Sequence, residues 1–409
     1  MKKLKFKELN TGYEGEKTVR ERKPMTPRRR AVFIMVATLV LAFLIVFLLS
    51  RFGIVPLGSL AARAGAVLSG DEKRFPIGIN TDSTLDIDKI GSNLLVLTTD
   101  NYTVYSEKGR ELFSSPHTFA RPAVCVSGDR AVIYDRGGTG YKLITASKEI
   151  YTGDASGTIL AAAHGKKGNY ALATRANGAT SRLDVYNRNH GVIFSYQSAE
   201  EYITSVTLSQ DGKFAGIAAV GAKNGDLYTV VNYFGFAYKE PLNRQVYTGV
   251  SPLKIDFTSD TSLTLFTEKG IYRIRKSAKK NDTVATFYQS EFSSYSENEK
   301  GRYAVVLAKY GSSDKYEILL YNGYGKKVDA FSCDEPVRSV ALSKKYVFAL
   351  TQDHILVYNF HGGLVSRIAL SGEAYDIYPT DDTVFVTSLD RIARCYSYGD
   401  SSISLTGKE

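Results

Sequence analysis

One pattern recurs about eight times along most of the chain: an apolar run, a polar turn, a second apolar run, another turn, and a third run. Its clearest form is VTLSQDGKFAGIAA at residues 206–219, where Asp211 and Gly212 stand between two apolar stretches. An Asp-Gly pair between apolar runs is a strong hairpin signal, because glycine accepts the positive φ of a tight turn. We therefore expect a series of similar antiparallel units.

The third run of most units ends in a tyrosine that is followed by a glycine. The runs are YTVYSEKGREL, LDVYNRNHGVIF, YTVVNYFGFAY, ILLYNGYGKKV and ILVYNFHGGLV. We expect the glycines to supply the positive φ of a turn, and the tyrosines to pack inward with their hydroxyls near solvent. The positions are Tyr105 with Gly109, Tyr186 with Gly191, Val231 with Gly235, Tyr321 with Gly325, and Tyr358 with Gly362.

The spacing of the units identifies the architecture. Eight units begin near Leu85, Arg121, Thr158, Ile203, Pro252, Phe292, Pro336 and Ala374, so successive starts are 36 to 49 residues apart. About 40–45 residues with four strands is the period of a propeller blade. The sequence predicts an all-β fold, a β-propeller of eight four-stranded blades, or of seven if the unit at Arg121 or at Pro252 is not a blade. The last unit contains only three runs, and RFPIGIN at residues 74–80 is expected to complete it.

Residues 31–50 contain no charge, proline or glycine. Twenty helical residues span about 30 Å, the thickness of the hydrocarbon layer of a bilayer. We interpret them as one transmembrane helix rather than a cleaved signal peptide, because the cleavable AARAGA at residues 61–66 lies too far beyond the apolar run. Arg28, Arg29 and Arg30 precede the run and only Arg51 follows it, which places the N-terminus in the cytoplasm of a bacterial cell.

The predicted organisation has four parts: a basic cytoplasmic tail at 1–30, a transmembrane helix at 31–50, a juxtamembrane linker at 51–74, and an extracytoplasmic propeller at 75–409. The net charge of the whole chain is +10, and residues 1–30 hold eleven Lys or Arg against four Asp or Glu, which is 11 − 4 = +7. The other residues therefore carry only 10 − 7 = +3. A basic tail beside a membrane favours orientation or contact with anionic lipid, and the near balance elsewhere argues against nucleic-acid binding.

The stretch VTLSQDGKFAGIAA resembles the inner hairpin of WD-repeat-like and related bacterial propellers, including quinoprotein-like ones. It departs from true WD repeats, since the chain has no tryptophan. The basic tail, the single apolar run and the Tyr-Asn-x-x-Gly repeats together resemble a bacterial family of membrane-anchored propellers, domain-of-unknown-function family 5711. The resemblance covers nearly the whole chain and implies no active site.

Motifs of the known propeller enzymes are missing from the sequence. The corner at Ser209 lacks the glycine spacing and tryptophan of sialidase turns, and propeller sites for quinone cofactors also need tryptophan. GVSPL at residues 249–253 is the nearest approach to a hydrolase nucleophile motif, and no Cys-x-x-Cys or phosphate loop occurs. RGGTGY at residues 136–141 is interpreted as a connecting loop. We expect no cofactor.

Metal ligands and disulfides are not clearly indicated. The five histidines do not have ligand spacing, and His190 and His361 stand just before turn glycines. Asp82, Asp86 and Asp88 could form a calcium site, but we favour an outward strand face for the last two, opposite Leu85, Ile87 and Ile90. Cys125, Cys333 and Cys395 are expected to be small core residues on strands, although one pair could form a disulfide.

The sequence favours a non-catalytic scaffold or ligand-binding module at the cell envelope, with a protein, peptide or glycan as its partner. The alternative is an enzyme that acts on envelope polysaccharide, with carboxylates in the propeller channel. Carboxylates that converge there with a basic or aromatic partner would favour the enzyme. A sensor is a third possibility, weakened by a cytoplasmic part of only thirty residues, which is too short to fold alone.

Overall fold

The computed structural model describes residues 75–79, 84–277, 282–287, 290–298, 301–309, 311, 315–322, 326–380, 383–395 and 402–405. The predicted tail, transmembrane helix and linker, with Arg28, Arg29 and Arg30, lie outside these residues, as do Asp82 and Gly325. In the part of the chain that the structure describes, no helix is long and apolar enough to cross a membrane.

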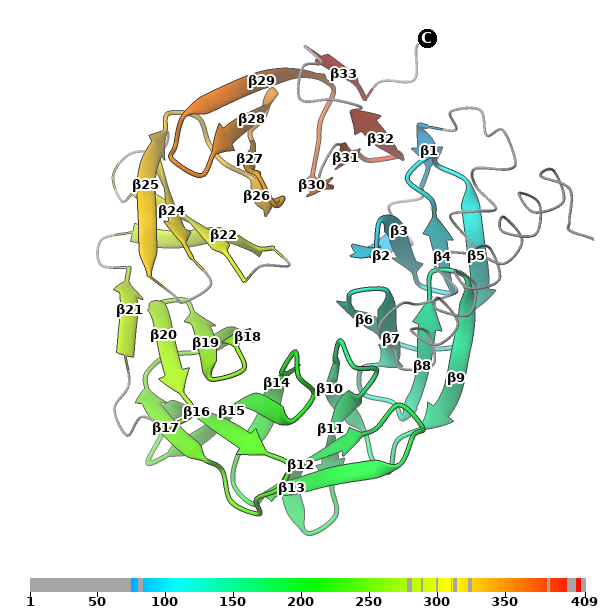
Figure 1. Cartoon of the computed structure of the whole chain (residues 1–409), viewed down its shortest axis with the longest axis vertical. Helices are drawn as coiled ribbons and strands as arrows, with labels where there is room; N and C mark the ends of the chain where they lie inside the picture. The colour runs from blue at the N-terminus through cyan, green and yellow to red at the C-terminus, as the bar shows by residue number, and fades with distance from the viewer. Residues whose placement is uncertain are drawn as a thin grey trace, which may run out of the picture. The chain divides into compact units, whose positions relative to one another are not determined.

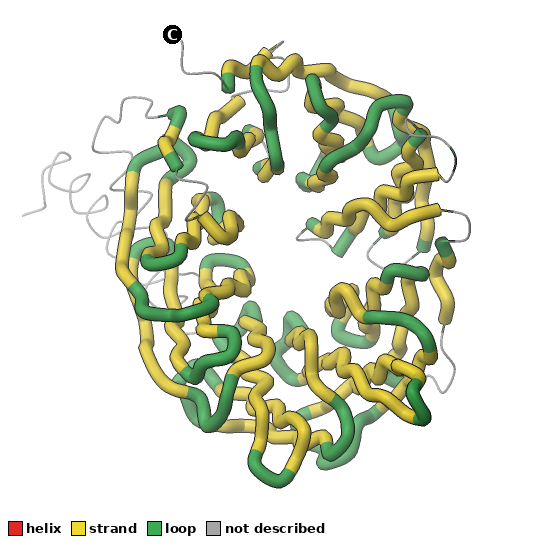
Figure 2. The backbone as a smooth tube through the Cα atoms, turned by 180° about the vertical axis from the view of Figure 1, so that it is seen from behind, coloured by secondary structure: helices red, strands yellow, loops and turns green. Residues whose placement is uncertain are grey.

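The described residues form a ring of eight blades, each a four-stranded antiparallel unit (Figure 1). The predicted eight-bladed propeller is confirmed, and the seven-bladed alternative is wrong because the units at Arg121 and Pro252 are both complete blades. Seen from behind, every blade consists of strands joined by turns and loops (Figure 2). The first four blades contain β2 (Thr84–Ile90), β3 (Asn93–Thr98), β4 (Asn101–Tyr105) and β5 (Glu111–Pro116); β6 (Pro122–Ser127), β7 (Arg130–Asp135), β8 (Gly140–Thr145) and β9 (Lys148–Asp154); β10 (Ile159–His164), β11 (Tyr170–Ala176), β12 (Ala179–Tyr186) and β13 (Val192–Ser198); and β14 (Tyr202–Leu208), β15 (Phe214–Lys223), β16 (Asp226–Gly235) and β17 (Asn243–Thr248).

The other four blades continue in chain order, except that the last one takes a strand from the beginning of the chain. They contain β18 (Pro252–Ser259), β19 (Ser262–Thr267), β20 (Gly270–Arg275) and β21 (Asp282–Thr286); β22 (Ser290–Glu297), β23 (Tyr303–Lys309), β24 (Tyr316–Tyr321) and β25 (Lys327–Cys333); β26 (Ser339–Leu342), β27 (Tyr346–Leu350), β28 (His354–Asn359) and β29 (Leu364–Ser371); and β30 (Asp376–Pro379), β31 (Val384–Thr387), β32 (Arg391–Cys395) and β1 (Ile77–Gly78).

The hydrophobic core is divided among the interfaces between blades. The second strand of most blades is apolar on both faces, as in the run LLVL of β3, because each face packs against a neighbouring blade. Eight apolar clusters result among the described residues, one between every pair of neighbouring blades. Burial of these clusters holds each blade against its two neighbours. The ring is therefore rigid only if blade 8 also packs against blade 1.

Closure occurs where the sequence predicts it. Ile77 of β1 is paired with Ile392 of β32, and Gly78 is paired with Arg391. The Ile79 N–H also donates to the Asp390 carbonyl at 2.8 Å. The strand RFPIGIN therefore completes the eighth blade from the opposite end of the chain.

One strand near the C-terminus was not predicted. β33 (Ser402–Ser404) adds in parallel to β29, the outermost strand of blade 7, and makes a five-stranded sheet. Ile403 and Leu405 are buried in the cluster between blades 7 and 8. The chain thus leaves blade 8 and returns to cover the edge of the preceding blade.

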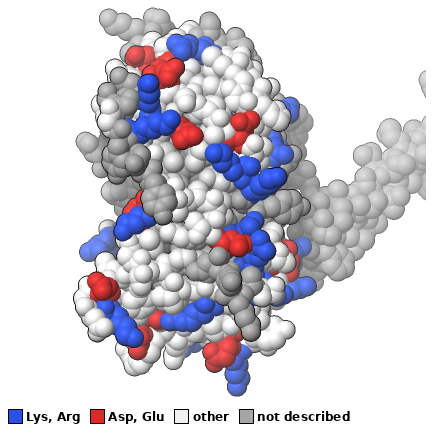
Figure 3. Space-filling view, turned by 90° about the vertical axis from the view of Figure 1, so that its left-hand side faces the viewer, with Lys and Arg blue, Asp and Glu red and all other residues white. Residues whose placement is uncertain are grey.

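The side of the molecule shown in Figure 3 carries Lys or Arg and Asp or Glu interspersed, with no continuous patch of one sign. This mixture agrees with the near balance of charge outside residues 1–30. A basic stripe of the kind that neutralises a nucleic-acid backbone is not present on this side.

Candidate functional site at the centre of the ring

The first strand of each blade in chain order is its innermost strand, so eight short strands surround the axis of the ring (Figure 1). They are β2, β6, β10, β14, β18, β22, β26 and β30. Any side chain that they direct away from the core can act at the centre. Charged side chains gather there on two sides.

The first group comes from neighbouring blades 5 and 6. On β18, Ile255 and Phe257 are buried in the core between blades 4 and 5, so Lys254 and Asp256 project to the other face of the strand. On β22, Tyr295 and Glu297 are likewise two residues apart and lie beside them. We call Lys254, Asp256, Tyr295 and Glu297 the axial cluster.

The contacts inside the axial cluster are close. The Nζ of Lys254 lies 2.7 Å from Oδ2 of Asp256 and 5.4 Å from the centre of the Tyr295 ring. The ring of Tyr295 stacks on Phe266 at 4.7 Å, which fixes its orientation. The Lys254 side chain is 43% exposed, so solvent reaches the centre of the ring at this point.

Glu297 holds its proton more tightly than an ordinary glutamate. Burial, the negative charge of Asp256 and a hydrogen bond between the two carboxyl groups raise the pKa of Glu297 to about 8. Burial alone would lower the pKa of Lys254, but Asp256, Tyr295 and Glu297 together hold it well above its ordinary value. At neutral pH the cluster therefore contains an ammonium at Lys254 and a neutral carboxylic acid at Glu297.

The second group faces the first across the ring, on blades 1 and 8. Oδ2 of Asp376 accepts a hydrogen bond from the Tyr378 hydroxyl at 3.0 Å, and Oδ1 accepts one from Ser339 of blade 7 at 2.5 Å. Burial and the charge of Asp88 raise the pKa of Asp86 to about 6. Burial also raises the pKa of Asp88, although Lys254, from the blade opposite, opposes that shift.

Asp86 and Asp88 project from the face of β2 opposite the buried Ile87, as predicted. That face belongs to an innermost strand of the ring, and Asp376 and Lys254 on other innermost strands act on these carboxyl groups. Ile87 and Ile90 are buried as expected, but Leu85 is 49% exposed because the ladder register shifts between Thr84 and Asp86. Among the described residues, no group of carboxylates, histidines and cysteines has the arrangement of a metal site.

Two of the three cysteines lie in the hydrophobic core, as predicted. Cys333 and Cys395 are buried in apolar clusters, whereas Cys125 on β6 is only partly buried. None of the three forms a disulfide among the described residues. Burial raises the pKa of Cys125 to about 11, and Lys254, Asp88 and Asp256 also act on its thiol. Cys125 therefore borders the centre of the ring, and it is held as an unreactive thiol.

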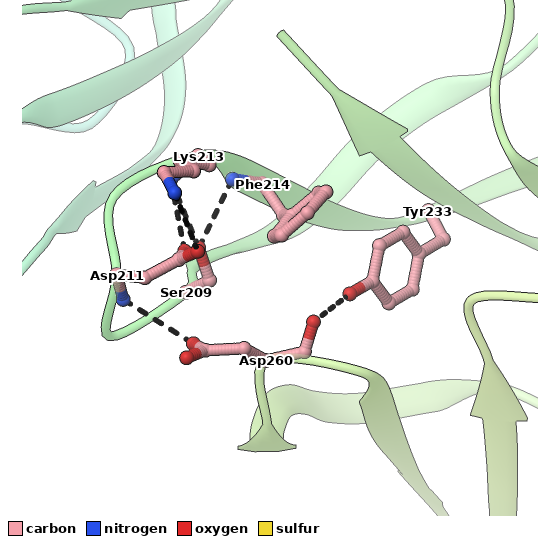
Figure 4. A network of polar contacts seen from close by, with 6 residues as sticks. All are labelled: Ser209, Asp211, Lys213, Phe214, Tyr233 and Asp260. Atoms are coloured by element: carbon pink, nitrogen blue, oxygen red, sulfur yellow. Dashed lines mark hydrogen bonds and ion pairs between the residues drawn. The ribbon is translucent and has the colours of Figure 1, made fainter.

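The Asp-Gly corner of blade 4 is a connection between blades (Figure 4). The Ser209 hydroxyl donates to Oδ1 of Asp211 at 2.7 Å and accepts the Phe214 N–H at 3.0 Å. The Asp211 N–H donates to Oδ1 of Asp260 in blade 5 at 3.2 Å, and the Tyr233 hydroxyl donates to the Asp260 carbonyl at 2.5 Å. The corner thus closes its own turn and binds the next blade.

The left-handed residue of the third-run turns lies four positions after the tyrosine. Gly109 and Gly362 occupy this position with φ of 81° and 74°. In blade 3 it is His190, with φ of 66°, rather than Gly191. The reason is the asparagine that follows the tyrosine: the side chain of Asn187 accepts the Gly191 N–H at 3.0 Å and sets the register of the turn.

Gly235 also departs from the expectation, since it ends β16 without a positive φ. The connection from β16 to β17 is seven residues long, so no tight turn is needed there. Asn359 closes the blade 7 turn as Asn187 closes that of blade 3, by accepting the Gly363 N–H at 3.0 Å. The Tyr-Asn dipeptides are therefore the sequence signal for these turns, in addition to the glycines.

The repeat tyrosines differ in burial. Tyr105 and Tyr186 are half-buried, and Tyr358 is 8% exposed. Tyr321 is 2% exposed with its hydroxyl buried, contrary to the expected position near solvent. It stacks at 4.7 Å on Tyr303, the residue opposite it in the ladder.

Comparisons with known proteins give a family and a fold. The model of a family of unknown function (DUF5711) matches residues 73–395, and the chain belongs to that family. No curated protein matches the sequence.

Several solved structures share the fold. A eukaryotic initiation factor is 12% identical over 82% of this chain and 90% of its own, with a TM-score of 0.55. The C-terminal WD40 domain of Sif2 is 13% identical over 79% of this chain and 99% of its own, with a TM-score of 0.53. BamB from Moraxella catarrhalis is 14% identical over 79% of this chain and 98% of its own, with a TM-score of 0.48.

Proposed function

We propose that this chain is a membrane-anchored, extracytoplasmic β-propeller that acts as a non-catalytic binding module at the bacterial cell envelope. Residues 31–50 would hold it in the membrane, and the three arginines before them would keep the tail in the cytoplasm. The partner would be an envelope protein, peptide or glycan that the ring binds through its centre and loops.

The observation that carries this proposal is the placement of charged and aromatic groups on opposite sides of the axis. Lys254 and Glu297 on blades 5 and 6 face Asp86 and Asp376 on blades 1 and 8. All four side chains start from strands whose register the blade ladders fix. Such a set of preorganised polar groups, accessible to solvent at Lys254, suits binding of a polar ligand without reorganisation.

A polysaccharide-cleaving enzyme is the second candidate, and the axial cluster favours it in one respect. Carboxyl groups do converge at the centre with a basic and an aromatic partner, and Glu297 keeps its proton at neutral pH, as a general acid must. Glycosidases hold their two carboxyl groups about 5–5.5 Å apart when they retain configuration and about 6.5–9.5 Å apart when they invert it. An activity assay decides whether any carboxyl pair at the centre of the ring works in this way.

The test is crosslinking in the native bacterium, followed by capture of the full-length chain from solubilised membranes. We compare the natural chain with Lys254→Met and Glu297→Gln, both of which keep side-chain volume at the centre. The proposal expects an envelope component that the natural chain captures and at least one variant captures less well. Capture of no envelope component above background would contradict it.

An enzyme assay separates the two candidates. The purified full-length chain is incubated with envelope polysaccharide from the same bacterium, and new reducing ends are measured. Binding without release of reducing ends supports the binding module. Release that Glu297→Gln abolishes would establish the enzyme instead.

A further inference from the structure

A cavity of about 620 Å³ lies between blades 1 and 2, away from the axial cluster. Its walls are the connection from β5 to β6 (residues 116–119), the turn from β7 to β8 with the start of β8, and the end of β9. This volume is in the range of small-molecule sites, about 300–1,000 Å³. From its lining we propose that this cavity is a binding site for a neutral saccharide. The proposal adds a site to the proposed function and does not depend on the location of the protein.

One wall is held in place by a buried histidine. His117 is 7% exposed, its Nδ1 accepts the Phe119 N–H at 3.3 Å, and its Nε2 therefore carries the proton that is donated to the Thr98 carbonyl at 3.0 Å. The imidazole also stacks on the Phe119 ring, with centroids 5.3 Å apart. Phe119 is thus an oriented, half-buried aromatic ring at the edge of the cavity, suited to packing against the C–H face of a sugar.

A second wall, in contact with Phe119 through Gly140, is the glycine-rich turn RGGTGY, which the sequence presented only as a connecting loop. The Gly137 N–H donates to the Ile159 carbonyl at 2.9 Å, and the Ile159 N–H donates to the Gly138 carbonyl at 2.8 Å, which fastens the turn to blade 3. A Cβ on Gly138 would lie 2.2 Å from Oδ2 of Asp135, and one on Gly140 would lie 2.7 Å from the Phe119 ring. Because Gly138 and Gly140 have no side chains, the Asp135 carboxylate and the Phe119 ring can lie directly against the backbone of the turn.

The polar side chains of the cavity include Asp135 and Asp154, whose carboxylates accept hydrogen bonds. Oδ1 of Asp135 accepts the Arg121 N–H at 2.9 Å, and Oδ1 of Asp154 accepts the Thr139 hydroxyl at 3.0 Å. The ammonium of Lys142 is held by Glu149 at 2.8 Å. Each aspartate thus has one carboxylate oxygen already bound, and both aspartates line the cavity together with Thr139 and Phe119.

This arrangement selects among ligand classes. Two carboxylates disfavour an anion. A guanidinium prefers both oxygens of one carboxylate, and here one oxygen of each is already bound. Single acceptor oxygens on separate walls instead match the separate hydroxyl donors of a sugar, and Phe119 matches its apolar face.

The test measures binding of maltose, cellobiose, lactose and N,N′-diacetylchitobiose to the purified full-length chain by saturation-transfer NMR and calorimetry. The detergent is lauryldimethylamine oxide, which has no sugar group that could compete. We expect at least one disaccharide to bind saturably at concentrations up to about 20 mM, a range suited to millimolar affinity. A tri-lysine peptide is the comparison ligand.

The variant Asp135→Asn keeps an oxygen for the Arg121 N–H but removes the charge that strengthens a hydroxyl–carboxylate bond. We expect it to weaken saccharide binding about tenfold or more, and Asp154→Asn to do the same. Asp226→Asn, an exposed aspartate at the start of β16, is the matched control and should bind as the natural chain does. If Asp135→Asn lowers the unfolding temperature, its loss of binding could come from unfolding, and the test then rests on saccharide binding by Asp154→Asn.

Saturable disaccharide binding that the two cavity variants weaken and the control keeps supports the site. Absence of binding by all four disaccharides, binding of tri-lysine alone, or disaccharide binding that no cavity variant changes would overturn it. Because the assay uses purified protein, its failure would leave the envelope crosslinking result standing, and the reverse also holds.

Discussion

Blade 4 and blade 8 have the same topology but are built differently. The two middle strands of blade 4, β15 and β16, have ten residues each, and the whole blade is one continuous stretch of chain. In blade 8 the strands β30 and β31 have four residues each, β32 has five, and β1 has two residues from the other end of the chain. Blade 4 can form locally, whereas blade 8 forms only when the ends meet, at a cost in loop-closure entropy. The ring should therefore open at blade 8 first.

The largest expected effect comes from removing one buried ring in each blade. Phe234 in blade 4 and Phe385 in blade 8 are both fully buried. We expect Phe234→Ala and Phe385→Ala each to lower the free energy of unfolding by about 3–5 kcal/mol, measured by urea denaturation. Hydrogen exchange should distinguish them: Phe385→Ala should speed exchange in β1, β31 and β32 while blade 4 stays protected. Exchange in β1 that remains as slow as in the natural chain would contradict the account.

The next variant acts on the closing strand itself. Ile77 is 7% exposed and packs between blades 8 and 1, so Ile77→Ala should cost about 2 kcal/mol of unfolding free energy. The control is Leu85→Ala in the next strand, where the side chain is 49% exposed, and its cost should stay within about 0.5 kcal/mol. Equal losses in the two variants would show that β1 does not close the ring.

Replacing one glycine in each blade by alanine compares the backbone conformations of blade 4 and blade 8. Gly212 in blade 4 has φ of 74°, and a Cβ there would lie 3.2 Å from the Cβ of Lys167. Gly78 in blade 8 has no positive φ and no atom within 4 Å of its added Cβ. Gly212→Ala should lower the unfolding free energy by about 1 kcal/mol, and Gly78→Ala should not lower it. A loss at Gly78 as large as that at Gly212 would contradict this difference between a strand and a turn.

The smallest expected effect is on the pH dependence of stability, and it involves neither blade 4 nor blade 8. Burial and Asp256 raise the pKa of Glu297 to about 8 from the 4.5 of an unperturbed side chain. The folded chain therefore binds more protons than the unfolded chain between these values, and its stability falls as pH rises through that window. Glu297→Gln should flatten the fall between pH 5 and 8 in urea denaturation, without changing hydrogen exchange in blade 4 or blade 8. An unaltered slope would show that Glu297 does not titrate as proposed.

The fold was predictable because its signals are local. Turn residues such as Asp211 and Gly212 act within a few positions, and the count of repeated units gave eight blades, with seven as the alternative. The place of β1 followed from the three runs of the last unit, since a ring leaves a gap if one strand is missing. β33 has no such signal: its three residues are ordered by burial of Ile403 in a cluster formed by two blades.

Most of the candidate site could not be predicted from the sequence. Lys254 and Asp256 alternate with buried residues, as do polar residues on many outward strand faces. That they meet Glu297 depends on how blades 5 and 6 pack together, which no local pattern encodes. Asp86 was singled out for its neighbours in sequence, and Asp88 is the charge that raises its pKa most, but Asp376 on the closing blade also acts on it. Cys125 was predicted as core for the same reason, since alternation does not distinguish the axis from an interface.

The central claim is that the anchored ring binds an envelope component at its centre. The most direct measurement places a photo-crosslinking amino acid at Tyr378, on the innermost strand of blade 8, and, as the matched control, at Val246, which is 50% exposed on the outermost strand of blade 4. Each full-length variant is produced in the native bacterium and irradiated in intact cells. The account predicts a crosslink from Tyr378 to a component outside the cytoplasm and none from Val246. A crosslink from Val246 alone, or from Tyr378 to cytoplasmic components only, would contradict it.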